Sequence, residues 1–354
     1  MHAFVVRGLQ VDGELRLSLP GTRSFQIDCR SSESPLEVRV ISVDLADYLD
    51  GLGIEEGRAR AGEVRVARDS EFGDPRTAAL VEITRCDGNT AWTREYLLTA
   101  LRLFCEGDFY IAGDIVMDTG GSTAGGTWLY GFDYSSITYQ RDVHLDEACV
   151  AELAGHVSEL HRTVDIFHDV PALSISLRYF LRSYQERRLR NDYGRHALSY
   201  QHAPLEDIVL RLSIALEALL LGRKTRDPKT VIARRAVRLL RAGGTDAKLV
   251  GRLCRWAYEV RSGVAHGSFT GFDGLQEPVP PGGLERTDPA YAAMLVRQVV
   301  RACIISVAGQ ITSSEELAAL LGGLNGGPPG PSRAAWLGIL PWPRNPRSTS
   351  GPTS

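Results

Sequence analysis

Residues 205–220 read LEDIVLRLSIALEALL, and this stretch decides the fold of the second half of the chain. Pro204 precedes it and Gly222 follows it, as is typical of the start and the end of a helix. Its apolar residues recur at the spacing of one helix face, which predicts a helix packed against a core. They are Leu205, Ile208, Val209, Leu212, Leu216, Leu219 and Leu220.

The sequence around this stretch is also helical from about residue 145 onward. Apolar periodicity and helix-start signals predict further helices over about 171–190, 229–242, 246–262 and 289–310. The pattern Ser313-x-x-Glu316 is a capping box that opens a short last helix. Residues 267–287 form a Pro/Gly-rich loop, and the Gly/Pro/Ser-rich tail after about 323 is predicted to be disordered.

The first 140 residues are predicted to be mainly β-strands. Alternating or continuous apolar runs indicate strands at 15–19, 36–40, 63–66, 79–83, 109–116 and 127–139, with one helix at about 93–105. Residues 120–126 read GGSTAGG, which lacks the Lys-Ser/Thr ending of a phosphate loop and predicts a hairpin loop. We therefore expect an α+β chain: a β-rich domain over 1–140, an all-α helical bundle over 145–322, and a tail over 323–354.

The composition is ordinary for a water-soluble globular protein of about two domains. The chain has 354 residues, 44% of them hydrophobic, with no run of 18 apolar residues and no signal peptide at its start. Its six cysteines include no Cys-x-x-Cys pair, which favours free thiols in the cytoplasm. Residues 205–268 hold 13 basic against 6 acidic residues in a chain of net charge −3, which favours an anionic partner.

Residues 261–267, Arg-Ser-Gly-Val-Ala-His-Gly, contain the best candidates for chemistry. An arginine that stays charged, beside a histidine that titrates near neutral pH, can cleave RNA without a metal. Arg261 and His266 are separated by about 140° around an unbroken helix. We expect Gly263 to end the helix, so that His266 folds back toward Arg261. The structural alternative is an arginine attracted by the helix dipole and a histidine that caps the helix.

Glu217 lies within a nearly apolar run, where a partly buried carboxylate needs a cation. Arg235, within the apolar stripe of the helix at 229–242, and Arg261 are the two candidates. The sequence favours a core ion pair between two helices, and a pair with Arg261 would also orient that guanidinium.

Arg234, Arg238 and Arg241 have the spacing i, i+4, i+7 and predict one exposed stripe. Such a stripe fits a phosphate backbone, although a solvated helix face explains it equally well. His156 and His161 are five residues apart rather than the four of a helical metal pair. We expect no metal site and no cofactor.

Two stretches together resemble the HEPN superfamily, and most closely the ApeA-like HEPN domains of prokaryotic defence systems. They are DIVLRLSIALEALL at 207–220 and AYEVRSGVAHG at 257–267. The resemblance covers roughly residues 145–322. Residues 1–140 have no such counterpart, and an appended sensor or recognition domain is what this architecture suggests.

The resemblance implies an all-α bundle and a metal-independent endoribonuclease, active as a homodimer, with an Arg-x4-6-His motif. Arg261 would hold the phosphate and His266 would move protons, leaving a 2′,3′-cyclic phosphate and a 5′-hydroxyl. Glu217, Arg235 and Ser262 would support the pair, although many active relatives carry Asn, Asp or His where this chain has Ser262.

The expected partners are RNA, a second copy of the chain, and a phage or stress trigger at the N-terminal domain, with no membrane. HEPN domains without nuclease activity also exist. The alternatives are therefore an inactive module that binds RNA or a nucleotide and dimerises, and a toxin-like nuclease neutralised by a partner.

Overall fold

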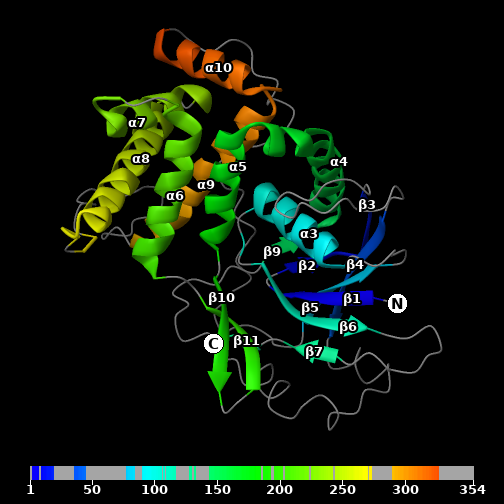
Figure 1. Ribbon diagram of the computed structural model, residues 1–354. Helices are drawn as coiled ribbons and strands as arrows, with labels where there is room; N and C mark the ends of the chain where they lie inside the picture. Colours follow the sequence, from blue (N-terminus) through cyan, green and yellow to red (C-terminus); the bar gives the residue numbers. More distant parts are fainter. Residues whose placement is uncertain are drawn as a thin grey trace, which may run out of the picture.

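Six N-terminal strands form one antiparallel sheet in the order β3-β4-β5-β1-β6-β7 (Figure 1). The computed structural model describes residues 2–326, apart from 8, 20–35, 45–76, 84–89, 106, 108, 117–126, 130, 133–142, 185, 193–194, 202–203, 223–224, 242–243, 270 and 273–288. The strands are β1 (His2–Arg7), β3 (Glu14–Leu19), β4 (Leu36–Asp44), β5 (Thr77–Ile83), β6 (Tyr110–Val116) and β7 (Thr127–Leu129).

Alternating residues of these strands enter the core, as a half-buried sheet requires. Leu15 and Leu17 of β3 are buried, as are Val38 and Val40 of β4. The predicted strands at 15–19, 36–40, 79–83 and 109–116 are thereby confirmed. The predicted strand at 63–66 and the loop at 120–126 lie outside the described residues.

Helix α3 (Thr90–Phe104) confirms the one helix predicted in this part and packs against helix α4 (Glu147–Asp169). Its apolar stripe enters the core through Leu97 and Leu101. Two short strands that the sequence analysis missed, β2 (Leu9–Val11) and β9 (Val143–Leu145), pair in parallel. This pair ties the start of the chain to the segment that leads into the helical part.

The helical part begins with α4 (Glu147–Asp169), whose N-cap Asp146 accepts a hydrogen bond from the backbone N–H of Cys149. Helix α5 (Pro171–Arg182) ends eight residues before the predicted end at 190. A hairpin of β10 (Glu186–Asp192) and β11 (Arg195–Gln201) follows, and β11 pairs with β8 (Gly131–Phe132). The prediction of an all-α domain was therefore wrong in this segment.

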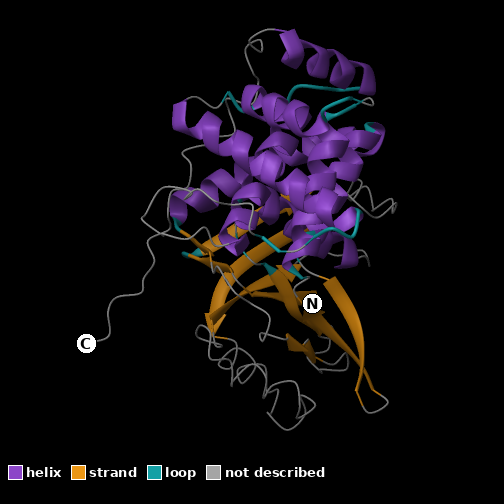
Figure 2. Cartoon of the chain, turned by 90° about the vertical axis from the view of Figure 1, so that its left-hand side faces the viewer, coloured by secondary structure: helices purple, strands orange, loops and turns teal. Residues whose placement is uncertain are grey.

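The remaining helices lie together with α4 and α5 on one side of the sheets (Figure 2). They are α6 (Leu205–Leu220), α7 (Pro228–Leu239), α8 (Gly244–Ala265), α9 (Pro289–Ala308) and α10 (Ser314–Gly326). Helix α9 is long and apolar enough to span a membrane, but 72% of its apolar window is buried inside the fold. Such burial is typical of the central helix of a water-soluble bundle.

Helix α10 begins with the predicted capping interaction in a modified form. Ser313 Oγ accepts a hydrogen bond from the backbone N–H of Glu316, and the Glu316 carboxylate accepts one from the N–H of Thr312. The helix continues to Gly326, so residues 323–326 are helical and do not belong to the predicted tail. Residues 327–354 lie outside the described residues.

Candidate active site at the end of helix α8

Helix α8 continues through Gly263 to Ala265, and Gly267 follows its C-cap. The backbone N–H of Gly267 donates to Val264 O (3.2 Å) and that of Ser268 donates to Gly263 O (2.9 Å). With Gly267 at φ 67°, this is the Schellman pattern of a helix C-terminus. The predicted helix break at Gly263 was wrong.

Gly263 lies inside helix α8 and faces the chain that follows the helix. A Cβ at this position would lie 3.4 Å from the Cα of Phe269, so the chain beyond α8 passes directly over it. Phe269 in turn packs edge-on against Phe272, with ring centroids 5.1 Å apart, and Phe272 contacts Trp256. Trp256 is core, as the sequence indicated, and both phenylalanines are partly buried against the core rather than free to stack on bases.

Arg261 points toward α6 and forms an ion pair with Glu217. Its Nε lies 2.9 Å from Glu217 Oε1, and its Nη2 donates to Glu217 Oε2 at 3.3 Å. The guanidinium also lies 5.9 Å from the ring centre of Tyr258, one turn earlier on α8. With 30% of the Arg261 side chain exposed and 19% of Glu217, the pair lies at the edge of the core.

Burial raises the pKa of Glu217, while Arg261 and a hydrogen bond with Ser213 partly offset this. The predicted ion pair between two helices is therefore present, with Arg261 as its cation. The Glu217 carboxylate contacts two nitrogens of the guanidinium, Nε by charge and Nη2 as the acceptor of its hydrogen bond, which orients Arg261.

His266 is exposed at the C-cap of α8, and Ser262, directly after Arg261, is partly buried. Because the helix is continuous from Arg261 to Ala265, Arg261 and His266 leave the axis about 140° apart. Among the described residues, no hydrogen bond or ion pair involves the His266 ring. The structure thus does not fold His266 back onto Arg261 within one chain.

Arg235 has a different role from the one predicted, since it does not contact Glu217. Its guanidinium is buried and donates to the carbonyl oxygens of Leu220 and Leu221 and to Asn325 Oδ1. These carbonyls belong to the end of α6, where the last backbone oxygens lack helical partners. Arg235 therefore holds the C-terminal ends of α6 and α10 to α7.

The three arginines predicted to form one exposed stripe, Arg234, Arg238 and Arg241, do not form one. Arg234 donates to Asn325 Oδ1 at 3.2 Å, and Arg238 donates to Leu324 O at 2.7 Å, so both contact α10. Arg241 lies beyond the end of α7 and has φ 50°, so the helical spacing does not extend to it. The sequence contained no signal that these arginines face α10, because the contact joins positions about 90 residues apart.

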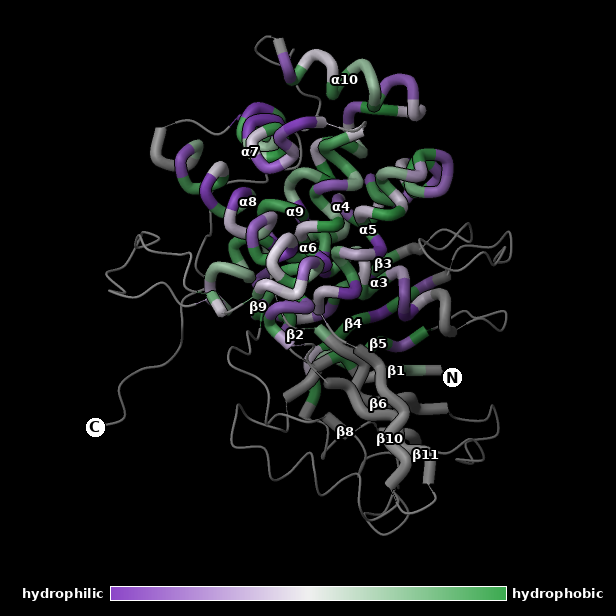
Figure 3. Tube along the Cα trace, turned by 60° about the vertical axis from the view of Figure 1, so that its left-hand side comes forward, coloured by the Kyte–Doolittle hydropathy of each residue, from purple (hydrophilic) through white to green (hydrophobic). Residues whose placement is uncertain are grey.

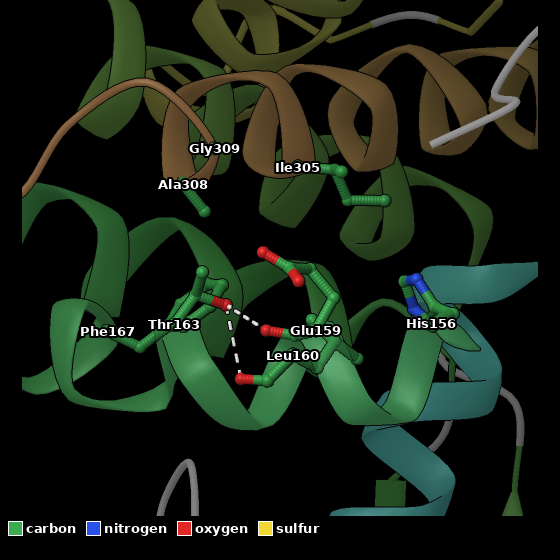
Figure 4. Close-up of a pocket in the computed structure, with 8 residues that line it drawn as sticks. All are labelled: His156, Glu159, Leu160, Thr163, Phe167, Ile305, Ala308 and Gly309. Atoms are coloured by element: carbon green, nitrogen blue, oxygen red, sulfur yellow. Dashed lines mark hydrogen bonds between the residues drawn. The ribbon is translucent and has the colours of Figure 1, made fainter. Parts of the chain in front are cut away.

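A small pocket of about 20 Å³ lies between α4 and the end of α9 (Figure 4). It is lined by His156, Glu159, Leu160, Thr163, Phe167, Ile305, Ala308 and Gly309. The Thr163 hydroxyl donates to backbone oxygens of its own helix, as the dashed lines show. None of the Arg261 site residues contributes to the pocket.

No protein-family model, curated protein or solved structure matches this chain. The similarity to HEPN proteins consequently rests on the residues of α6 and α8 quoted above.

Proposed function

We propose that this chain is a metal-independent endoribonuclease of a prokaryotic defence or stress-response system, acting in the cytoplasm. Arg261 and His266 are its catalytic pair. The proposal rests on one observation. The partly exposed guanidinium of Arg261 is held by Glu217, and the exposed imidazole of His266 lies five residues further on, at the same end of α8.

Arg261 retains donors for a phosphate while it is paired with Glu217. The carboxylate contacts Nε and Nη2, and a guanidinium has five N–H donors in a fixed plane. Nη1 and the second hydrogen of Nη2 remain to bind a phosphate and to stabilise the charge that develops on it.

His266 supplies the proton transfers of the reaction. A neutral imidazole accepts the proton of the ribose 2′-OH, whose oxygen attacks the phosphorus while the P–O5′ bond breaks. The imidazolium of His266 then gives this proton to the leaving 5′-oxygen, and the products are a 2′,3′-cyclic phosphate and a 5′-hydroxyl. DNA is inert because it lacks the attacking hydroxyl.

The separation of Arg261 and His266 around α8 supports a site shared between two copies of the chain. In a homodimer that juxtaposes two α8 ends, His266 of one protomer approaches the phosphate bound by Arg261 of its partner. The β-rich N-terminal domain then acts as the sensor that responds to a phage or stress trigger.

The test is cleavage of labelled RNA in EDTA by the wild type and by Arg261→Ala and His266→Ala. His161→Ala, on α4, is a matched control for loss of a histidine. We expect cleavage by the wild type and the control only. Cleavage that survives both site substitutions, or requires a divalent metal, would contradict the proposal.

One observation favours the alternative of an inactive HEPN module that binds RNA or a nucleotide. Helix α8 does not bring His266 to the side of Arg261. For such a module, RNA binding in the same buffer would depend on Arg261, and no variant would cleave.

A further inference from the structure

Three arginines of α7 converge on the C-terminal end of α10. Arg234 and Arg235 both donate to Asn325 Oδ1, each at 3.2 Å, and Arg238 donates to Leu324 O. Figures 1 and 3 show α10 beside α7 at the end of the bundle remote from the sheet. One amide oxygen and one carbonyl oxygen thus receive three charged donors.

The acceptors of these three guanidiniums among the described residues are all neutral. Within the part of the chain that the structure describes, no carboxylate lies within ion-pair distance of Arg234, Arg235 or Arg238. The pKa of Arg235 is lowered by its burial and by the neighbouring charge of Arg234. The cluster therefore holds three positive charges, and the oxygen atoms that accept their hydrogen bonds carry no negative charge.

A phosphate is a stronger acceptor than the groups that now occupy the cluster. A phosphate carries a negative charge that the carbonyl and the amide lack, and a guanidinium can donate two parallel hydrogen bonds to phosphate oxygens. The carbonyl of Leu324 and the amide of Asn325 thus occupy donors that a phosphodiester could use.

The packing of α10 permits its release. It is amphipathic, with a buried stripe of Leu317, Leu321 and Leu324 and an exposed opposite face, and α7 is its main neighbour. Leu321 also contacts the turn at Gly222 after α6, where an added Cβ would lie 3.2 Å from its Cδ1. An element that few neighbours hold opens at a lower free energy than the central helices of a bundle.

We propose that Arg234, Arg235 and Arg238 form a phosphodiester-binding site for RNA that α10 covers, so that RNA and α10 compete for the same donors. The inference rests on the proposed function in taking RNA as the polyanion. It adds that α10 is an autoinhibitory element of that RNA-binding surface.

The test measures RNA affinity separately from cleavage. All proteins carry His266→Ala, and fluorescence anisotropy follows a short labelled RNA over a range of salt concentrations. Asn325→Ala removes the acceptor shared by Arg234 and Arg235. Gln310→Ala is the control, because that amide donates to Ser306 O within its own helix end.

We expect Asn325→Ala to bind RNA about ten-fold more tightly than its parent, and Gln310→Ala to bind equally. The slope of log K against log salt should steepen by about 1.4, since each added phosphate contact on a single strand contributes about 0.7. Adding Arg234→Ala and Arg235→Ala to Asn325→Ala should abolish the gain.

Hydrogen exchange provides the second measurement. Saturating RNA should increase amide exchange in residues 314–326 and decrease it in α7. The inference is overturned if Asn325→Ala leaves the RNA affinity unchanged, or if its higher affinity persists after the arginines are removed. It is also overturned if the protein binds no RNA, or if RNA leaves the exchange protection of α10 undiminished. Failure of the nuclease proposal is seen separately, as absence of cleavage by the protein with His266 intact.

Discussion

Acidification should destabilise this protein through His156. The residue lies on α4, is 6% exposed, and its ring packs against Phe104 of α3 with centroids 5.5 Å apart. Its Nε2 is buried without a hydrogen-bond partner. Burial, and to a lesser degree the positive charge of Arg301, lower the pKa of His156 from 6.5 to about 4, against the opposing effect of a hydrogen bond to the Ala100 backbone.

The sign of the effect follows from the two protonation states. The unfolded chain protonates this histidine near pH 6.5, whereas the folded chain resists protonation until about pH 4. Between these values the unfolded chain binds more protons, so the free energy of unfolding falls as the pH falls. The contribution of the neutral His156 to the free energy of unfolding is complete above pH 6.5. About 2 kcal/mol of it is lost by pH 5 and about 3 kcal/mol by pH 4.

Urea unfolding followed by circular dichroism at pH 7 and pH 5 measures this loss. Other groups titrate in the same range, so the informative quantity is the difference between the wild type and His156→Phe. The variant should lose about 2 kcal/mol less than the wild type between the two pH values. His266→Gln, at an exposed histidine, should behave like the wild type. Equal losses for the wild type and His156→Phe would refute the reasoning.

Three further predictions concern the site and its support. Gly267→Ala should destabilise the protein by about 1 kcal/mol, because residue 267 has φ 67°, whereas Gly263→Ala should be neutral or stabilising by up to about 1 kcal/mol in thermal unfolding; the reverse order would place the helix end at Gly263. Arg261→Ala should cost about 1–2 kcal/mol by leaving the carboxylate of Glu217 without its cation, and Glu217→Gln should recover part of that loss in a double-mutant cycle; strict additivity would argue against the pair. Arg235→Lys should cost about 2 kcal/mol in urea unfolding, because one ammonium cannot replace the guanidinium contacts to the ends of two helices; an unchanged midpoint would contradict this role.

The sequence predicted the long helices well because each has a strong local pattern. The apolar stripes of α6 and α8 and the Pro289 start of α9 are visible in single windows of the chain. The β10–β11 hairpin was missed because the apolar periodicity of α5 was extended beyond Arg182 into an arginine-rich segment. That segment forms strand β10 because it pairs with β11, and the local sequence does not specify this pairing.

The sequence predicted which residues form the candidate site, but not which residues each of them contacts. The apolar surroundings of Glu217 required a cation, but the choice between Arg235 and Arg261 depends on how α6 packs against α7 and α8. The end of α8 had a usable signal: Val264 continues the stripe of Val260 and is partly buried, so the helix had to pass Gly263. The contact of Arg238 with α10 joins residues far apart in the chain, so no local sequence signal predicted it.

The most direct test of the endoribonuclease proposal is a cleavage assay on an oligonucleotide that is DNA except for one ribonucleotide. The reaction contains EDTA, and the product ends are identified by mass spectrometry. The wild type should cut only after the ribonucleotide and leave a 2′,3′-cyclic phosphate, while His266→Ala leaves the strand intact. Cutting at deoxynucleotides, a 3′-hydroxyl product, or equal activity of His266→Ala would contradict the proposed mechanism.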